Sequence, residues 1–577
     1  MRPPHPSRRG LRPLLRMRAE KGVLESQPIP PRSAAMTDPN ATPQTIAQIL
    51  QQGLFHHRQG QLRPAMERYM EVLRINPEHA EALYCCAVVA CAEGQFKEGV
   101  EVVRRAIKFG PATAKMYNVL GQALDRLGEP LEAIKAIDQA IALDPKLAAA
   151  HGNRANIMVD AGMPLEALKS FDKAIDLDPA SVPDLINRGA LYESIGRPAE
   201  ALKDYDKALM GSPGDPRILM NRGAVLKDLG LLDLGGGAET SPRFKEAIAS
   251  YDQAIKAAPR MHEAFAARGQ IKMMLGDWPA GFADYDHRGQ LPEPTYKALP
   301  EPRWHGEERK GERIVLTSEQ GLGDAIQFSQ LAPWLAAQGH DVTLMVRPGL
   351  KALLSTLEGV TIVTSEDELR TSDKPMRWAP LMSVPGIMEL TPDEMPCQAP
   401  YLKAEPARVA KWRDTLGERK AFRIGINWAP GHADRTVTSR RDIPLAAFKA
   451  IADLPGVELY ALQKGAPLEQ IKGVSFREQI KVLDADNDPK APLFLDTAAI
   501  IDNLDLVIGC DTAIVHLAGA LGRPVFTAVP VISDWRWMIS RDDTPWYPTM
   551  RVFRQDSSGN WAALMARVAA AVAELRG

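Results

Sequence analysis

Proline recurs through the first half of the chain at a constant spacing of 34 residues. These prolines are Pro43, Pro77, Pro111, Pro145, Pro179 and Pro213, and Pro259 follows after the same spacing plus an extra 12 residues. A fixed period of this length indicates one supersecondary unit, which buries its apolar face by stacking on its neighbours. The extra residues lie in LLDLGGGAETSPRF, which is rich in turn-forming residues and predicts a surface loop between two helices.

Each repeat is expected to be a pair of helices. The unit 179–212, PASVPDLINRGALYESIGRPAEALKDYDKALMGS, has apolar residues at helical spacing in two segments that Gly196 separates. Gly189 allows the first helix to approach the second closely, and the next proline ends the pair because it cannot continue a helix. Period, glycine, alanine, aromatic residue and proline together resemble the tetratricopeptide repeat family over residues 43–292.

Two columns of polar residues recur within the repeats. Asparagines recur at a first-helix position that in this family faces the concave groove, namely Asn153, Asn187 and Asn221. Each amide can bond an extended peptide backbone, although asparagine is also common at this position without a ligand. Arginines of the first helices are in register with aspartates of the second helices, which favours structural ion pairs. They are Arg154, Arg188, Arg222 and Arg268, with Asp138, Asp172, Asp206, Asp252 and Asp286.

The repeat period breaks at 289–313, a stretch rich in proline and charge that marks a domain boundary. Beyond it, short β-branched runs alternate with helical segments, which predicts a parallel α/β sheet. The expected strands are 313–317, 341–346, 360–364, 422–428, 457–462, 504–509 and 524–529. A helical connector at 404–421 divides them into two sets, and 364–400 has little strand signal, so the first set is expected to be trimmed. Two such units facing each other leave a cleft between the carboxyl ends of their sheets.

Two polar turns follow strands of the two sets. Asp511 and Thr512 directly follow LDLVIGC, and the helix after them carries His516. Free backbone N–H groups at such a turn favour a phosphate, although an ordinary helix cap and a buried core histidine also explain these residues. In RIVLTSEQGLGDAIQF, Gly321 and Gly323 allow a tight turn and close approach to a ligand, and Asp324 begins the helix. The alternative there is again a helix cap, and the pattern is not the GxGxxG dinucleotide fingerprint.

The two turns together resemble the heptosyltransferase family of glycosyltransferases. EQGLGDAIQF and DTAIVHLAGALGRPV carry the resemblance, and LQKG and DWRWMISRDDTPWYP strengthen it over residues 300–570. The chain is still more similar to bacterial proteins that fuse tetratricopeptide repeats to such a domain. In architecture alone it also resembles the protein O-linked N-acetylglucosamine transferases. The resemblance implies a GT-B fold of two Rossmann-like halves, with the nucleotide-sugar donor held by the second half and the acceptor by the first.

The same resemblance implies roles for individual residues. Asp324 matches the base that takes the acceptor proton. Donor-binding positions are Asp511, Thr512, Ala513, His516, Arg440, Arg441 and, more weakly, Lys464, with Arg435 as a further basic residue of the same loop. Arginines and a helix N-terminus would stabilise the departing diphosphate without a metal. The chain departs from the family pattern at NWAPGH and SRRDIP, which puts the acceptor and activity itself in doubt.

Composition excludes several classes of function. The formal net charge of −2 gives no global basic field for nucleic acid. No run of about 18 apolar residues predicts a membrane span, although peripheral association stays open. The five cysteines form no CxxC pair, which argues against a zinc or disulfide framework and favours a reducing, cytoplasmic compartment.

The predicted organisation is an α-solenoid followed by an α/β GT-B domain. The expected parts are a disordered arginine-rich tail at 1–36, repeats at 37–292, a linker at 293–312, an acceptor-side half at 313–405 and a nucleotide-sugar half at 406–577. The predicted function is sugar transfer, without a cofactor, to a protein or glycan acceptor recruited by the repeats. The alternatives are a protein-binding scaffold with an inactive transferase-like domain and, third, a heat-shock co-chaperone.

Overall fold

The computed structural model describes residues 43–308, 311–397, 399–431, 439–486, 492–539 and 541–576, so the predicted tail at 1–36 lies outside the described residues. The chain forms two compact units, Met1–Asn221 and Arg222–Gly577. Their boundary falls inside a helix of the repeats, before the point where the 34-residue pattern ends. The last repeat helices therefore belong to the same compact unit as the sheets, and the domain limits drawn from the sequence stay predictions.

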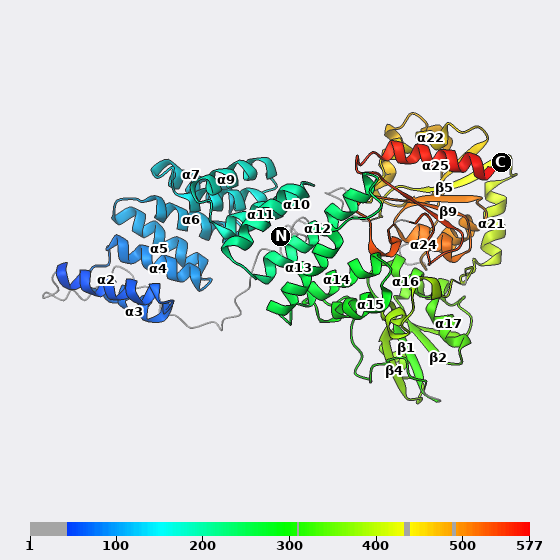
Figure 1. Ribbon diagram of the computed structural model, residues 1–577, viewed down its shortest axis with the longest axis horizontal. Coiled ribbons are helices and arrows are strands. Elements are labelled where there is room, and N and C mark those ends of the chain that lie inside the picture. Colours follow the sequence, from blue (N-terminus) through cyan, green and yellow to red (C-terminus); the bar gives the residue numbers. More distant parts are fainter. Residues whose placement is uncertain are drawn as a thin grey trace. The chain divides into compact units, whose positions relative to one another are not determined.

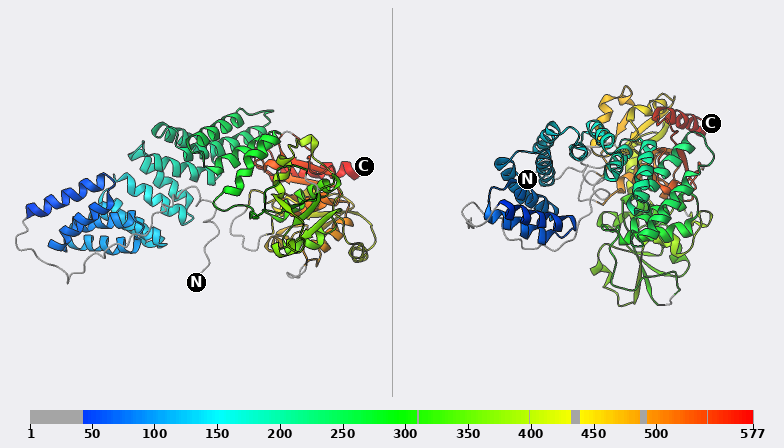
Figure 2. Two further views of the ribbon diagram at one scale, coloured as in Figure 1. Left: turned by 90° about the horizontal axis from the view of Figure 1, so that it is seen from below. Right: turned by 60° about the vertical axis from the view of Figure 1, so that its left-hand side comes forward.

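The first half of the chain folds into consecutive helices that pack in pairs, as the repeat period predicts. They are α2 (Pro43–Arg58), α3 (Leu62–Ile75), α4 (Ala80–Ala92), α5 (Phe96–Phe109), α6 (Ala114–Leu127), α7 (Pro130–Leu143), α8 (Ala148–Asp160), α9 (Pro164–Leu177), α10 (Val182–Ser194), α11 (Pro198–Gly211), α12 (Pro216–Gly235), α13 (Arg243–Ala257), α14 (His262–Met274) and α15 (Trp278–Tyr285). Figures 1 and 2 show the helices α4 to α9 stacked side by side in the first unit.

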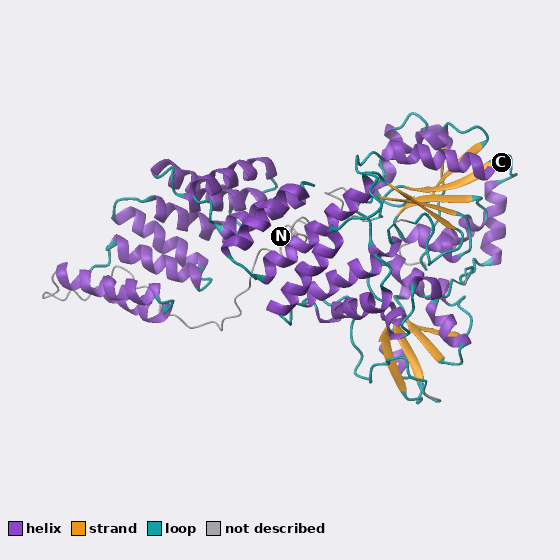
Figure 3. Cartoon of the chain, viewed as in Figure 1, coloured by secondary structure: helices purple, strands orange, loops and turns teal. Residues whose placement is uncertain are grey.

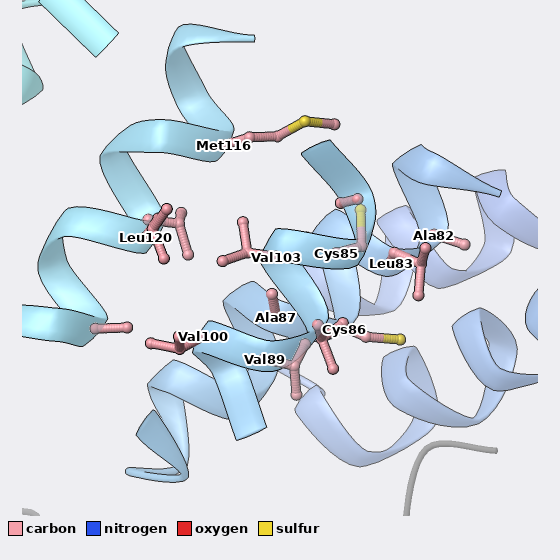
Figure 4. Close-up of a cluster of buried hydrophobic side chains, with 14 of the residues drawn as sticks. Ala82, Leu83, Cys85, Cys86, Ala87, Val89, Val100, Val103, Met116 and Leu120 are labelled. Atoms are coloured by element: carbon pink, nitrogen blue, oxygen red, sulfur yellow. The ribbon is translucent and has the colours of Figure 1, made fainter. Parts of the chain in front are cut away.

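Small residues let these helices approach each other closely. Figure 4 shows Val100, Val103 and Leu120 gathered with the apolar residues of α4 in one continuous core. In α10, a Cβ added to Gly189 would lie 2.7 Å from a ring carbon of Tyr205 on α11, closer than real Cβ atoms come. The prediction that Gly189 admits a close neighbour is therefore confirmed.

The insertion in the repeats forms the expected loop only in part. We expected its 12 extra residues to form a surface loop. Residues 236–242 are a loop before α13, but α12 is also extended to 20 residues, whereas α10 and α14 have 13 each. Glycine-rich sequence continues the helix to Gly235 because the end of the helix is held by another part of the second unit: the backbone N–H of Ser557 donates to Gly235 O at 3.0 Å.

Two parallel sheets follow the repeats (Figure 3), which confirms the predicted sheet type. The first has strand order β3-β2-β1-β4 and the second β10-β9-β8-β5-β6-β7. Their bounds are β1 (Arg313–Thr317), β2 (Asp341–Met345), β3 (Val360–Val363), β4 (Met376–Pro380), β5 (Phe422–Asn427), β6 (Val457–Ala461), β7 (Ile480–Val482), β8 (Leu506–Cys510), β9 (Val525–Val529) and β10 (Met550–Arg554). All seven predicted strands are present, and β4, β7 and β10 were not predicted.

Helices connect the strands and cover the sheets. They are α16 (Leu322–Phe328), α17 (Leu331–Ala337), α18 (Lys351–Leu354), α19 (Glu366–Leu369), α20 (Val384–Ile387), α21 (Pro406–Leu416), α22 (Lys449–Ala452), α23 (Leu495–Asp502), α24 (Ala513–Ala520) and α25 (Trp561–Arg576). In Figure 1, α25 and α24 lie on opposite faces of the second sheet. Alternate residues explain this: Ile424 and Ile426 of β5 share a core with α25, whereas a Cβ on Gly509 of β8 would meet Val515 of α24 at 2.9 Å. None of the described helices is both long and apolar enough to cross a membrane.

Candidate functional site

The two polar turns predicted from the sequence meet in the second unit. Gly323 opens α16 at the carboxyl end of β1, and α24 begins at the carboxyl end of β8. A Cβ added to Gly323 would lie 3.0 Å from His516 Cδ2 and 3.4 Å from Ala513 Cα. The glycine therefore allows the first turns of α16 and α24 to touch, although the two segments are far apart in the sequence.

The turn before α16 is held by Asp324. Its Oδ2 accepts a hydrogen bond from the backbone N–H of Gly321 at 2.8 Å, so the carboxylate satisfies an N–H group at the start of the helix. The left-handed backbone lies at Gln320, with φ of 55°, rather than at Gly321 or Gly323. We expected the glycines to allow a tight turn and the close approach of a ligand. In the structure, Gly323 instead makes room for α24. Arg347, at the end of β2, donates to Gln320 O and supports the same turn.

Arg536 joins the two turns, and sequence reasoning missed it. It lies in the short helix η9 (Trp535–Trp537), and its side chain is 9% exposed. Its guanidinium lies 2.6 Å from Asp324 Oδ1 and 2.9 Å from Asp534 Oδ1, and it donates to Gln327 Oε1 at 3.0 Å. Burial alone would lower the pKa of Arg536, but Asp534, Asp324 and Asp511 raise it above its ordinary value. Both carboxylate oxygens of the predicted base, Asp324, thus have partners.

Asp511 and His516 form a buried pair at the start of α24. Asp511 Oδ1 lies 3.6 Å from His516 Nε2, and the two side chains are 6% and 4% exposed. Burial on its own raises the pKa of Asp511, but His516, Arg536 and Arg441 hold it well below its ordinary value. His516 Nδ1 is 3.1 Å from the Tyr547 hydroxyl. Its ring stacks on Trp537 with centroids 5.6 Å apart, so a hydrogen-bonding neighbour and an aromatic neighbour together fix the imidazole.

Thr512 does not cap the helix that it precedes. Its side chain makes no capping bond, because its hydroxyl donates to Asn427 Oδ1 at 2.7 Å. Asn427 Nδ2 donates in turn to Gln463 Oε1 at 3.0 Å. This chain links the carboxyl ends of β8, β5 and β6, and neither Asn427 nor Gln463 was predicted. Their place directly after the runs FRIGI and LYAL is the signal that could have identified them.

The predicted basic residues lie at different places along this edge. Arg441 donates to Asp511 O at 3.1 Å, and its guanidinium lies 3.9 Å from the Asp511 carboxylate. Arg440 instead pairs with Asp228 of α12 at 3.1 Å. Lys464 donates to Ala485 O, and burial lowers its pKa. Arg435 lies outside the described residues.

A second buried ion pair connects the last repeat helices to the first sheet. Arg288, in the short helix η2 (Asp286–Gln290), donates to both carboxylate oxygens of Glu319 at 2.8 and 2.7 Å. The two side chains are 1% and 0% exposed. Glu319 directly precedes Gln320, where the chain turns. The side-chain amide of Gln320 donates to the Tyr285 hydroxyl at 2.9 Å. The end of the repeats therefore fixes the first polar turn.

Within the described residues, no three His, Cys, Asp or Glu side chains lie together in a way that could hold a metal.

Comparison with known proteins bears on the first half of the chain. Residues 118–182 match the tetratricopeptide repeat family. The N-terminal region carries tetratricopeptide repeats. Protein FlbA of Caulobacter vibrioides is 29% identical over 328 residues, which cover 53% of this chain and 54% of FlbA. The chain thus spans about half the length of that relative, and the match names no activity for the α/β region.

Several solved structures are similar to the tetratricopeptide repeats. MamA is 26% identical, with a TM-score of 0.25, over 28% of this chain and 93% of its own. A thermophilic TPR protein of Thermus thermophilus is 24% identical, with a TM-score of 0.29, over 31% and 98%. YrrB, described as a TPR protein with an unusual peptide-binding site, is 23% identical, with a TM-score of 0.25, over 30% and 88%.

Two members of the asparagine column of the tetratricopeptide repeats bond to other asparagines of the preceding repeats. Asn153 donates to Asn118 at 2.9 Å, and Asn187 donates to Asn156 at 3.0 Å. Asn221 is 4% exposed, so its amide is buried. Peptide binding by this column stays a prediction. The contacts show an amide ladder that runs between neighbouring tetratricopeptide repeats.

The arginine column forms predicted ion pairs at Arg154, Arg188 and Arg268, and Arg222 lies 3.9 Å from Glu246. Arg188 lies 2.7 Å from Asp172 of the preceding repeat and 2.7 Å from Asp204 of its own repeat. Arg268 makes the equivalent pairs with Asp252 and Asp284 at 2.6 Å each. Asp286, which we expected in this column, instead pairs with Arg303 at 2.6 Å, because it lies beyond α15 in η2.

Proposed function

We propose that this chain is a cytoplasmic glycosyltransferase that moves a sugar from a nucleotide-diphosphate sugar to a protein or glycan acceptor. The observation that carries the proposal is the meeting of the two polar turns at the carboxyl ends of two parallel sheets. Ligands bind at this edge in open α/β folds. The five free cysteines are consistent with a reducing compartment.

Three features support a diphosphate beside α24. The first turn of this helix has no side-chain cap, since the Thr512 hydroxyl bonds elsewhere. Helix N-termini favour anions because of their unpaired N–H groups and the helix dipole. Arg441 is 43% exposed and lies against Asp511, so a positive group stands beside this turn. In the proposed reaction, Arg441 and the N-terminus of α24 stabilise the charge that develops on the departing diphosphate.

The proposed architecture is a GT-B fold. The first sheet and its helices form the acceptor half, and the second sheet forms the nucleotide-sugar half. Asp324 is the group placed to take a proton from an acceptor hydroxyl. For that step its Oδ1 has to exchange the contact with Arg536 for the hydroxyl. Repeats of this family commonly bind protein partners, and here we assign them the recruitment of the acceptor.

We expect UDP, GDP, ADP or dTDP to raise the melting temperature of the full chain, and Arg441→Ala to abolish most of that rise. A ligand that binds only the folded state stabilises it, by about 2.7 kcal/mol when present at one hundred times its Kd. The measurement is a thermal-shift titration with each of the four nucleotides. Arg419→Ala is the matched control, because Arg419 pairs with Asp505 before the opposite, amino end of β8. An absence of any shift, or equal losses in both variants, would contradict the proposed site.

A second candidate function is a protein-binding scaffold whose α/β region has lost turnover. The observation that favours it is that both carboxylate oxygens of Asp324 already have partners, namely Gly321 N–H and Arg536. Asp324→Asn separates the two functions. For a transferase, we expect the release of nucleoside diphosphate from a nucleotide sugar to fall by about two to four orders of magnitude, the usual contribution of a general base. A scaffold would bind the nucleotide and release nothing in either form, as measured by a coupled assay.

A further inference from the structure

Helix α12, which the insertion lengthens beyond Asp228, brings a carboxylate to the basic turn of the proposed donor site. Asp228 lies on α12 within the second unit, and its side chain is 9% exposed. Its Oδ2 is 3.1 Å from Arg440 Nη1, and its Oδ1 is 3.2 Å from Nζ of the adjacent Lys227. A largely buried carboxylate requires a cation or hydrogen-bond donors nearby, and Arg440 supplies one from a distant part of the sequence.

The turn that carries Arg440 also carries Arg441. Within it, Ser439 N–H donates to Asp442 Oδ2 at 2.8 Å, and Asp442 N–H donates back to Ser439 O at 2.9 Å. Ile443 N–H then donates to Trp428 O at 2.9 Å. These bonds make residues 439–443 a single tight turn, so a contact that holds Arg440 also limits the movement of Arg441.

The extended part of α12 is itself anchored. Gly235 accepts a hydrogen bond from Ser557 N–H at 3.0 Å, and a Cβ added to Gly235 would lie 2.5 Å from Val531 Cγ2. Val531 and Ser557 follow β9 and β10, so the helix end packs beside the carboxyl edge of the second sheet. Asp228 therefore approaches the basic turn from a support that is fixed to the same sheet.

We propose that Asp228 is a positioning residue: through Arg440 it holds the 439–442 turn so that Arg441 faces Asp511 and the start of α24. Helix α12 of the repeats thereby orders part of the site that we assign to the nucleotide diphosphate. The inference rests on the proposed function for its ligand. The ordering of the turn is a separate property that can be measured without any ligand.

The first test is hydrogen exchange of the full chain without nucleotide. Asp228→Asn and Arg440→Ala are each expected to speed exchange of the Asp442 and Ile443 amides by about tenfold, while the β8 amides keep their rates. Asp233→Asn is the matched control, because Asp233 lies on the same helix but pairs with Arg243 at 2.9 Å. Unchanged exchange at 442–443 in both variants overturns the positioning role, whatever the chain binds.

The second test measures Kd for UDP, GDP, ADP and dTDP by titration calorimetry. We expect Asp228→Asn and Arg440→Ala to weaken binding about five- to tenfold, a loss typical of ordering one side chain. The charge-swapped pair Asp228→Arg with Arg440→Asp should restore it, and Asp228→Asn should add nothing to Arg441→Ala. The positioning of Arg441 by Asp228 is overturned if the losses of Asp228→Asn and Arg441→Ala add, or if the charge-swapped pair does not restore binding. If wild type binds no nucleotide while exchange at 442–443 still responds, the proposed function fails and the positioning of the turn stands.

Discussion

Replacing Arg288 by methionine is expected to lower the free energy of unfolding of the second unit by about 3–5 kcal/mol. The loss is large because Glu319, whose side chain is fully buried, would keep its charge without its bidentate partner. Urea unfolding followed by tryptophan fluorescence measures this unit alone, since all ten tryptophans lie after residue 221. Removing one member of a buried pair costs far more than removing one member of an exposed pair.

Lys297→Met is the matched control for this experiment. Lys297 also joins the segment after the repeats to the first sheet, through Glu366 at 2.6 Å, but its side chain is 80% exposed. An exposed pair of this kind contributes about 0–1 kcal/mol. Equal losses in the two variants would show that the Arg288–Glu319 pair is no more important to stability than a surface contact.

Arg536→Met is expected to destabilise the same unit by a similar amount, about 3–5 kcal/mol at neutral pH. The substitution leaves Asp324 and Asp511 without the cation that both share. Because the pKa of Asp511 is lowered in the folded state, its charge contributes stability above the unfolded pKa of about 4 and loses it as the pH falls. The gap between wild type and variant should therefore stay constant from pH 7 to about pH 4 and narrow as the pH falls further below 4 in the urea measurement.

Arg541→Met is the control that tests whether the loss of unfolding free energy in Arg536→Met comes from the buried site. Arg541 lies four residues after the short helix η9 and pairs with Asp543, whose side chain is 70% exposed. We expect a loss below about 1 kcal/mol for this variant, with little dependence on pH over the same range, including below pH 4. A pH-independent loss in Arg536→Met would instead mean that packing around η9, rather than charge, accounts for its stability.

Much of the fold could be predicted from the sequence because it is written in local patterns. The 34-residue proline period predicted the helix pairs, and β-branched runs predicted the central strands of both sheets. Strand β4 was missed because MRWAP contains a proline and only one typical strand former, Trp378, yet it pairs in parallel with β1. The lengthening of α12 was missed for a related reason: tertiary contacts at Gly235 override the turn-forming character of three consecutive glycines.

The site was predictable in outline and not in detail. The turn at Gly321–Asp324 and the turn at Asp511 each follow a strand, so the place of each at the carboxyl edge of its own sheet follows from the topology of parallel sheets. Their actual link, Arg536, lies 212 residues after Asp324 in an aromatic segment that carries no periodic pattern. No local rule connects such positions. The same holds for Arg440, which forms its ion pair with Asp228 on a repeat helix.

The arginine ladder of the tetratricopeptide repeats has a consequence for how that region unfolds. Each of Arg188 and Arg268 bonds at once to an aspartate of its own repeat and to one of the repeat before it. In a linear array, cooperativity depends on such nearest-neighbour coupling terms. Part of that coupling is electrostatic, and the outer aspartates Asp172 and Asp252 are half exposed to solvent. Added salt screens these contacts, so we expect the array to melt less cooperatively at high ionic strength, with the N-terminal hairpins opening ahead of those joined to the sheets.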